Sequence, residues 1–122
     1  MITDIFLEEV AKYMNAEAST TVSDLTFSST VITPDATDTS VAGELGARVT
    51  TTNSRSSTVP TVTFIGTRSG AIASSSGDFV NLVALFTASS GGNLMAEALV
   101  PSVLHTTSFD LEVNWSITAA RK

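Results

Sequence analysis

The last stretch of the chain is the feature that most restricts its fold. From Phe109 to Thr118, apolar and polar residues alternate without exception. Because successive side chains of a strand point to opposite faces, this alternation predicts a half-buried strand. Its inward residues would be Phe109, Leu111, Val113, Trp115 and Ile117. A strand of this kind close to the end of the sequence favours an antiparallel all-β domain that is closed by its last element.

Composition agrees with that fold class. Hydrophobic residues make up 43% of the 122 residues and charged residues 15%, which excludes a disordered chain. Many of the remaining residues are threonine, which favours strands, and serine, which favours turns. We therefore predict an all-β fold, an antiparallel β-sandwich with one N-terminal α-helix. Residues 1–18 would form the helix and a linker, and residues 19–122 would form the β-sandwich domain.

The N-terminal residues carry the one convincing helical pattern, over residues 2–14. Thr3 can cap its start and Asn15 can end it in a left-handed conformation. Glu8 and Glu9 are interpreted as a solvated face. The apolar side is expected to pack on the sandwich of its own chain or to reach a neighbouring subunit. Its residues recur at helical spacing and are Ile2, Ile5, Phe6, Val10, Tyr13 and Met14.

Further strands are predicted between turn-forming segments. The almost wholly apolar run 79–87 predicts a strand that is buried on both faces. It would form a hairpin with residues 94–100 across the turn residues 89–93, and Pro101 is expected to end the second strand. The other expected elements are strands at 24–28, 48–52 and 59–67, a turn at 53–57, loops at 30–39 and 69–78, and either a helical turn or an extended bend at 40–47.

No catalytic constellation is recognisable. Cysteine is absent and His105 is the only histidine, so His105 would have to serve as the base of any triad. A G-x-S-x-G nucleophile motif is missing, and no carboxylate stands near His105 in the sequence. We interpret His105 as a loop residue before the last strand and expect no enzymatic activity. No residue is assigned as catalytic, cofactor-binding or metal-binding.

Two polar clusters have a functional and a structural interpretation. Asp35 and Asp38, among threonines, could bind calcium, but they lack the ligand alternation of an EF-hand, so turn chemistry is favoured. Glu44 and Arg48 are interpreted as a local brace rather than a ligand anchor. The glycine pairs of the chain lack the Gly-Lys-Ser/Thr of a phosphate loop, so turn and bulge roles suffice.

Charge limits the partners. The net charge of −6 gives a surface that repels phosphates, which argues against nucleic acid and anionic membranes as partners. No segment reaches the roughly 20 apolar residues of a membrane span, and the features of a signal peptide are lacking.

The order of the motifs resembles a known group of proteins. A short strand at 24–28 and a Pro/Asp/Thr loop are followed by four motifs. They are Asp38-Thr39-Ser40-Val41-x-x-Glu44-x-x-x-Arg48, Leu82-Val83-Ala84-Leu85-Phe86, Gly91-Gly92-Asn93-Leu94-Met95-Ala96 and Leu111-x-Val113-x-Trp115-x-Ile117. Over residues 24–118 this order is similar to small virion structural proteins of tailed viruses, β-sandwich proteins of the tail, neck or capsid. It is also similar to the N-terminal module of tail-collar fibre proteins. The chain departs from the second motif, E-V-G-L-F in the family, at Leu82 and Ala84.

The resemblance implies a non-enzymatic role in the virion. The protein would form a symmetric homo-oligomer on the tail, neck or fibre attachment region. Its partners would be further copies of itself and other virion proteins. A capsid decoration protein is one alternative. Another is a carbohydrate- or calcium-binding β-sandwich module, with host surface glycan as its partner. That module would need exposed aromatic side chains, whereas most aromatic residues fall on predicted inward faces.

Overall fold

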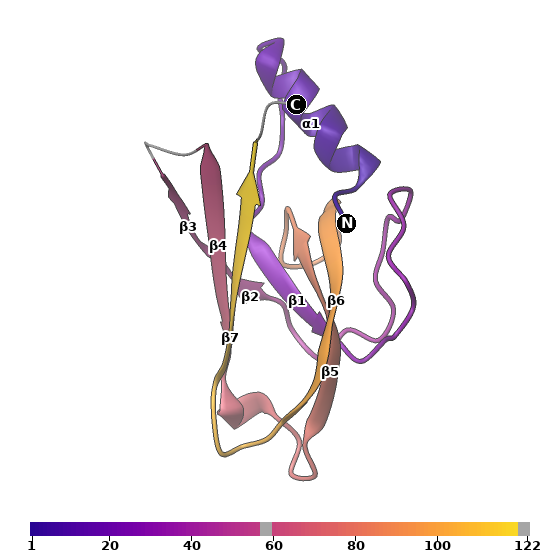
Figure 1. The fold of residues 1–122 in the computed structure, drawn as a ribbon, viewed down its shortest axis with the longest axis vertical. Helices are drawn as coiled ribbons and strands as arrows, with labels where there is room; N and C mark the ends of the chain where they lie inside the picture. The colour runs from indigo at the N-terminus through magenta and orange to yellow at the C-terminus, as the bar shows by residue number, and fades with distance from the viewer. Residues whose placement is uncertain (57–59, 120–122) are drawn as a thin grey trace.

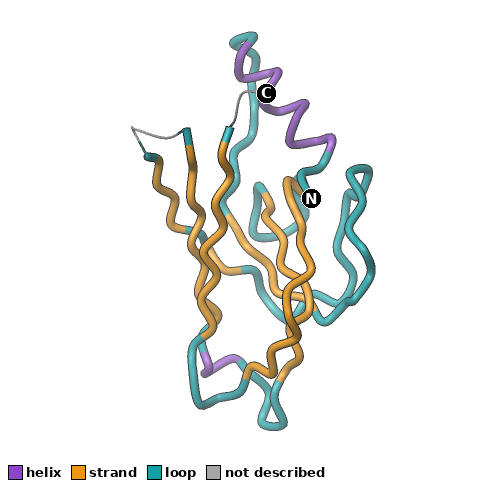
Figure 2. Tube along the Cα trace, viewed as in Figure 1, coloured by secondary structure: helices purple, strands orange, loops and turns teal. Residues whose placement is uncertain are grey.

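The computed structural model describes residues 1–56 and 60–119. Within these ranges the chain forms one α-helix, one short 3-10 helix and seven strands (Figures 1 and 2). The predicted all-β fold with a single N-terminal helix is confirmed. The elements are α1 (Asp4–Met14), β1 (Asp24–Ser28), β2 (Val49–Thr50), β3 (Thr52–Arg55), β4 (Thr61–Arg68), η1 (Gly70–Ile72), β5 (Asp78–Phe86), β6 (Leu94–His105) and β7 (Leu111–Thr118).

The strands build two antiparallel sheets. One has the order β2-β1-β5-β6 and the other β3-β4-β7, and the main hydrophobic core lies between them. The chain crosses from the first sheet to the second between β2 and β3. Figure 1 shows α1 lying over one end of the sandwich, where it packs against β6.

The predicted hairpin of the apolar run is confirmed as β5 and β6. Residues 80 and 82–86 of β5 are buried. One face of the strand packs in the main core, and the other face forms a second cluster with Leu94, against which Val41 packs. Phe79 is the exception. It is paired with Leu104, which is also exposed, at the far end of the hairpin, and 58% of its surface is accessible.

The prediction that Pro101 ends the second strand is wrong. β6 continues through Pro101 to His105. The pairing with β5 is irregular between Val80 and Leu82, and Pro101 lies opposite this irregularity on an edge strand. Proline lacks the N–H that a regular ladder requires, so an irregular edge position tolerates it.

The alternation of the last strand is confirmed over Leu111–Thr118, where half-buried and exposed residues alternate. The strand begins later than predicted, because Phe109 lies in the preceding loop with its ring partly exposed. Trp115 packs against the core but is only half-buried. The reason is that β7 is an edge strand of the narrower sheet.

The structure corrects or decides the remaining predicted segments. The predicted turn at 53–57 is largely strand β3, whose residues are all exposed and therefore carry no apolar pattern. Asn15 caps α1 without a left-handed conformation, and the next residue, Ala16, adopts it instead with a φ of 56°. The predicted strand 59–67 is β4; position 59 lies outside the described residues. Segment 40–47 is an extended bend with turns rather than a helix.

Candidate functional site

Helix α1 buries only part of its apolar side. Ile5 and Phe6, near its start, pack against the core. Farther along the helix, Val10 and Tyr13 are exposed, Tyr13 at 76% of its surface. Leu7 and Met14 are exposed as well. The helix therefore packs on its own sandwich, as one of the two interpretations held, but it leaves a second apolar surface uncovered.

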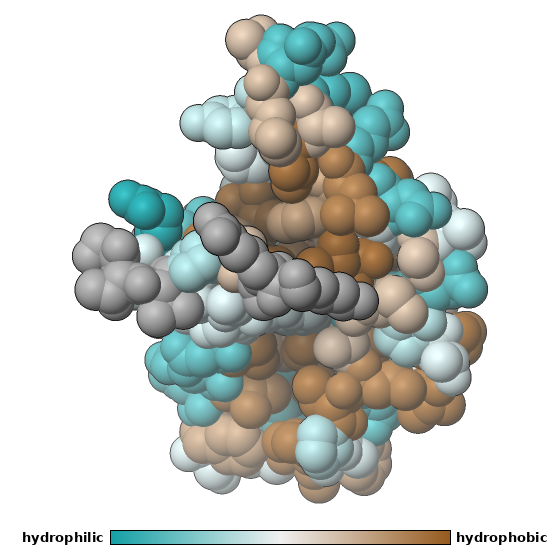
Figure 3. Space-filling model, turned by 45° about the horizontal axis from the view of Figure 1, so that its top comes forward, coloured by the Kyte–Doolittle hydropathy of each residue, from teal (hydrophilic) through white to brown (hydrophobic). Residues whose placement is uncertain are grey.

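A groove lies beneath this helix. Its volume is about 350 Å³, and its wall is mostly apolar. Figure 3 shows hydrophobic surface gathered directly below the helix at this end of the molecule. The groove joins the helix to the inner face of β4 and to the segment before β1. Its lining residues are Phe6, Glu9, Val10, Tyr13, Ser19, Thr20, Thr21, Val22, Asn53, Val62, Phe64 and Met95.

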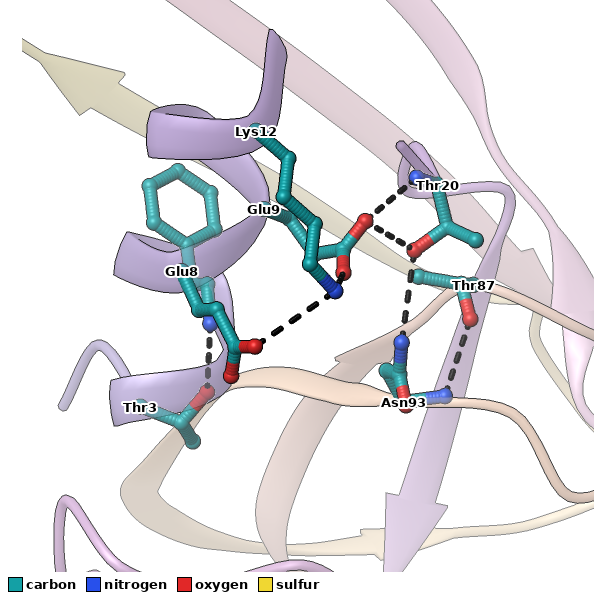
Figure 4. A network of polar contacts seen from close by, with 8 residues as sticks. Thr3, Glu8, Glu9, Lys12, Thr20, Thr87 and Asn93 are labelled. Atoms are coloured by element: carbon teal, nitrogen blue, oxygen red, sulfur yellow. Dashed lines mark hydrogen bonds and ion pairs between the residues drawn. The ribbon is translucent and has the colours of Figure 1, made fainter. Parts of the chain in front are cut away.

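Polar contacts hold the helix over the groove (Figure 4). Thr3 caps it as predicted, accepting a hydrogen bond from the backbone N–H of Phe6 at 3.3 Å. The same hydroxyl donates to the carbonyl of Leu94 in β6 at 2.6 Å. This single side chain therefore both begins the helix and fastens it to the sandwich.

Glu9 is the second anchor of the helix. It was expected on a solvated face, but it is buried. Its carboxylate accepts from Lys12 Nζ at 2.9 Å and from the backbone N–H and hydroxyl of Thr20. The hydrogen bond from Lys12, followed by those from Thr20, lowers the pKa of Glu9 to about 2. Asn93 in turn donates to the Thr20 hydroxyl at 3.3 Å, so the helix is tied to the β5–β6 turn.

His105 lies at the opposite end of the sandwich, and its prediction as a loop residue is wrong. It is the last residue of β6 and is fully buried. Its Nδ1 lies 2.6 Å from Arg68 Nη1, and Arg68 Nη2 donates to Asp78 at 2.8 Å. The Asp78 carboxylate is therefore connected to the His105 ring only indirectly, through the guanidinium of Arg68. Sequence offered no signal for this cluster, since its members come from β4, β5 and β6.

The contacts of His105 determine which ring nitrogen carries the proton. Arginine can only donate hydrogen bonds, so Nδ1 accepts and Nε2 carries the proton. That N–H then donates to the carbonyl of Phe109 at 2.8 Å. Both ring nitrogens are therefore occupied by structural contacts within the fold.

The acidic loop has the turn chemistry that was favoured over calcium binding. Asp35 accepts hydrogen bonds from the N–H and hydroxyl of Thr37, and Asp38 accepts from the N–H of Asp35. Within the described residues, no group of three or more histidine, aspartate and glutamate residues could hold a metal ion. Asp38 also lies beside the buried Glu97 of β6, and both residues line a hollow of about 230 Å³.

The predicted brace is confirmed. Arg48 Nε donates to Glu44 at 2.8 Å. Its Nη1 donates to the carbonyls of Ala88 and Gly91. The guanidinium also lies over the ring of Phe86, 3.4 Å from the ring centroid. Arg48 thereby ties the bend at 40–47 to the β5–β6 turn.

Glu97 makes stability depend on pH. Burial, and then the neighbouring Asp38 carboxyl, raise the pKa of Glu97 from 4.5 to about 7. The folded state therefore holds this proton more tightly than the unfolded state. The resulting stabilisation is fully present below pH 4.5 and is lost as the pH rises through 7. We expect the free energy of unfolding to fall by about 1–3 kcal/mol between pH 5 and pH 8 through this group.

Urea unfolding across this pH range measures the effect. Glu97→Gln, which mimics the protonated side chain, should remove the dependence, and the exposed Glu112→Gln should retain it. Glu9 does not contribute in this window, since its pKa of about 2 keeps it ionised. Equal pH profiles for Glu97→Gln and the wild type would contradict the assignment.

Comparisons with family models, with characterised proteins and with solved structures gave no match to this chain. Among the described residues, the helix is too short and too polar to cross a lipid bilayer.

Proposed function

We propose that this protein is a non-enzymatic virion structural protein of a tailed virus. It assembles as a symmetric homo-oligomer on the tail, neck or fibre attachment region. The observation that carries the proposal is the exposed apolar side of α1 beside an apolar groove. The order of sequence motifs supports the viral assignment. Structural proteins that assemble with one another need exposed apolar surfaces, whereas hydrolytic catalysis needs a nucleophile and a base within reach of each other.

The position of the apolar surface favours assembly. Leu7, Val10, Tyr13 and Met14 lie on successive turns of one short helix, so they form a contiguous stripe. The helix is fastened at Thr3 and Glu9, so the stripe is held in a fixed orientation before any partner binds. A preorganised apolar surface loses little conformational entropy on association. This geometry suits a second folded subunit.

The self-association is tested with two variants of equal charge. Val10→Glu places a carboxylate in the groove, and Ala11→Glu places one on the neighbouring exposed position of the same helix. We expect Val10→Glu to raise the dissociation constant about tenfold or more, because an unpaired charge would be buried at the interface. Ala11→Glu should stay close to the wild type. Sedimentation equilibrium of the three proteins gives these constants.

Two outcomes count against the proposal. A wild-type protein that stays monomeric at its highest soluble concentration contradicts self-association. Purified virus particles that lack the protein, analysed by mass spectrometry beside the infected-cell lysate that contains it, contradict the virion assignment. Protein found on the capsid but not on isolated tails would favour the alternative, a capsid decoration protein.

A further inference from the structure

Among the described residues, three of the four sheet edges are protected against strand addition, and the fourth is open. β2 has two residues and β3 has four. β6 contains Pro101 and an irregular pairing, and the first residues of the chain bond to its other end through the bridge between Ile2 and Ala96. β7 is eight residues long, regularly paired with β4 and free of proline. Natural proteins rarely leave such an edge unprotected unless it is used.

The free backbone groups of β7 can be assigned. The N–H of Ala119 donates to the carbonyl of Pro60 on the β4 side, at 2.9 Å. Backbone groups of alternate residues point to the same side of a strand, so positions 111, 113, 115 and 117 face β4. The side-chain hydrogen bonds between Thr61 and Thr118 and between Thr63 and Ser116 occupy the intervening pairs. The N–H and C=O groups of residues 112, 114, 116 and 118 therefore point to the open edge.

We propose that β7 of a second copy of this chain pairs antiparallel with this open edge, around a two-fold axis at Trp115. The proposal rests on the proposed self-association and adds a second interface at β7, separate from the one proposed on the apolar side of α1. In this register residue 114 lies opposite residue 116 of the second copy, and residue 112 lies opposite residue 118. All four outward-pointing residues then form backbone hydrogen bonds. A register centred on Asn114 would leave residue 118 without a partner.

The side chains of β7 are self-complementary in this register. On the outer face, Asn114 meets Ser116 of the second copy, and Glu112 meets Thr118. No like charges face each other, although the chain carries a net charge of −6. On the inner face, Val113 meets Ile117, and the two Trp115 rings meet at the axis.

The inner face also gives a reason for the pairing. Leu111, Val113, Trp115 and Ile117 are only half-buried in the single chain, although they pack against the core. Pairing at β7 joins two three-stranded sheets into one of six strands. The added strand covers the side of these residues that the chain itself leaves open. Aromatic and β-branched pairs of this kind stabilise neighbouring strands.

A charge-pair experiment tests the register. Asn114 and Ser116 are both exposed on the outer face. The double variant Asn114→Asp/Ser116→Asp places two carboxylates opposite each other twice in the dimer. The double variant Asn114→Lys/Ser116→Asp places a lysine opposite an aspartate at the same two places. We expect the first to raise the dissociation constant about tenfold or more and the second to restore it to about the wild-type value.

A second readout comes from the only tryptophan. Burial at the axis predicts that Trp115 emission shifts to longer wavelength when the wild-type dimer is diluted, and that the Asp/Asp variant shows the shifted emission at every concentration.

Asn114→Lys/Ser116→Lys repeats the repulsion with the opposite charge and serves as the test if the Asp/Asp variant does not fold. A wild-type oligomer that both like-charge variants leave intact overturns the β7 interface and spares self-association. A monomeric wild type overturns both.

Discussion

Replacement of His105 by alanine is expected to lower the free energy of unfolding by about 2–4 kcal/mol. The imidazole is fully buried between the two sheets. Its removal leaves a cavity and takes away the acceptor of Arg68 Nη1 and the donor to the Phe109 carbonyl. A buried donor without a partner costs more than the lost hydrogen bond itself, because its desolvation is no longer compensated.

The neighbouring Thr107→Ala is the control for His105→Ala, since Thr107 is exposed and makes no hydrogen bond through its side chain within the described residues. Urea unfolding followed by circular dichroism gives both stabilities. The assay is paired with esterase, glycosidase and peptidase substrates. Wild-type turnover that His105→Ala abolishes while the fold persists would assign His105 a catalytic role instead of a structural one.

Strand patterns were predictable because they depend on neighbours in the sequence. Alternation located β7, and the apolar run located β5, since each reports burial of one face or of both. β3 was missed because it is exposed on both faces, so its position depends only on backbone pairing with β4. Phe109 continues the alternation of β7 but lies before the strand, because backbone pairing with β4 begins at Leu111.

The polar contacts were less predictable than the strands. Glu44 and Arg48 pair as predicted, although the helical turn that would bring residues four apart together does not form, and the bend at 40–47 brings them together instead. Arg68, which bonds to His105, comes from another strand, and the contact between Glu9 and Thr20 depends on how the chain returns beneath the helix. The apolar period of α1 identified the helix. The same apolar period could not show how much of the apolar side of α1 the sandwich would cover, because that depends on the width of the sandwich end on which α1 packs.

Replacement of Phe86 by alanine is expected to have the largest effect on stability, a loss of about 3–5 kcal/mol. Only 2% of Phe86 is exposed, and its ring packs in the outer cluster with Leu82 and Leu94. The ring also supports the guanidinium of Arg48, whose hydrogen bonds hold the bend at 40–47 and the β5–β6 turn. Truncation therefore removes apolar packing and the support of the brace together.

Two variants separate the contributions to the effect of Phe86→Ala. Phe86→Leu keeps most of the apolar volume but removes the cation–π contact, so a loss of about 1–2 kcal/mol is expected. Phe79→Ala removes the same ring from an exposed position of the same strand and should cost less than about 1 kcal/mol. Chemical denaturation of the three variants beside the wild type measures each loss. Equal losses for Phe86→Ala and Phe79→Ala would show that the outer cluster does not form a second core, and that the bend at 40–47 is held by its polar contacts alone.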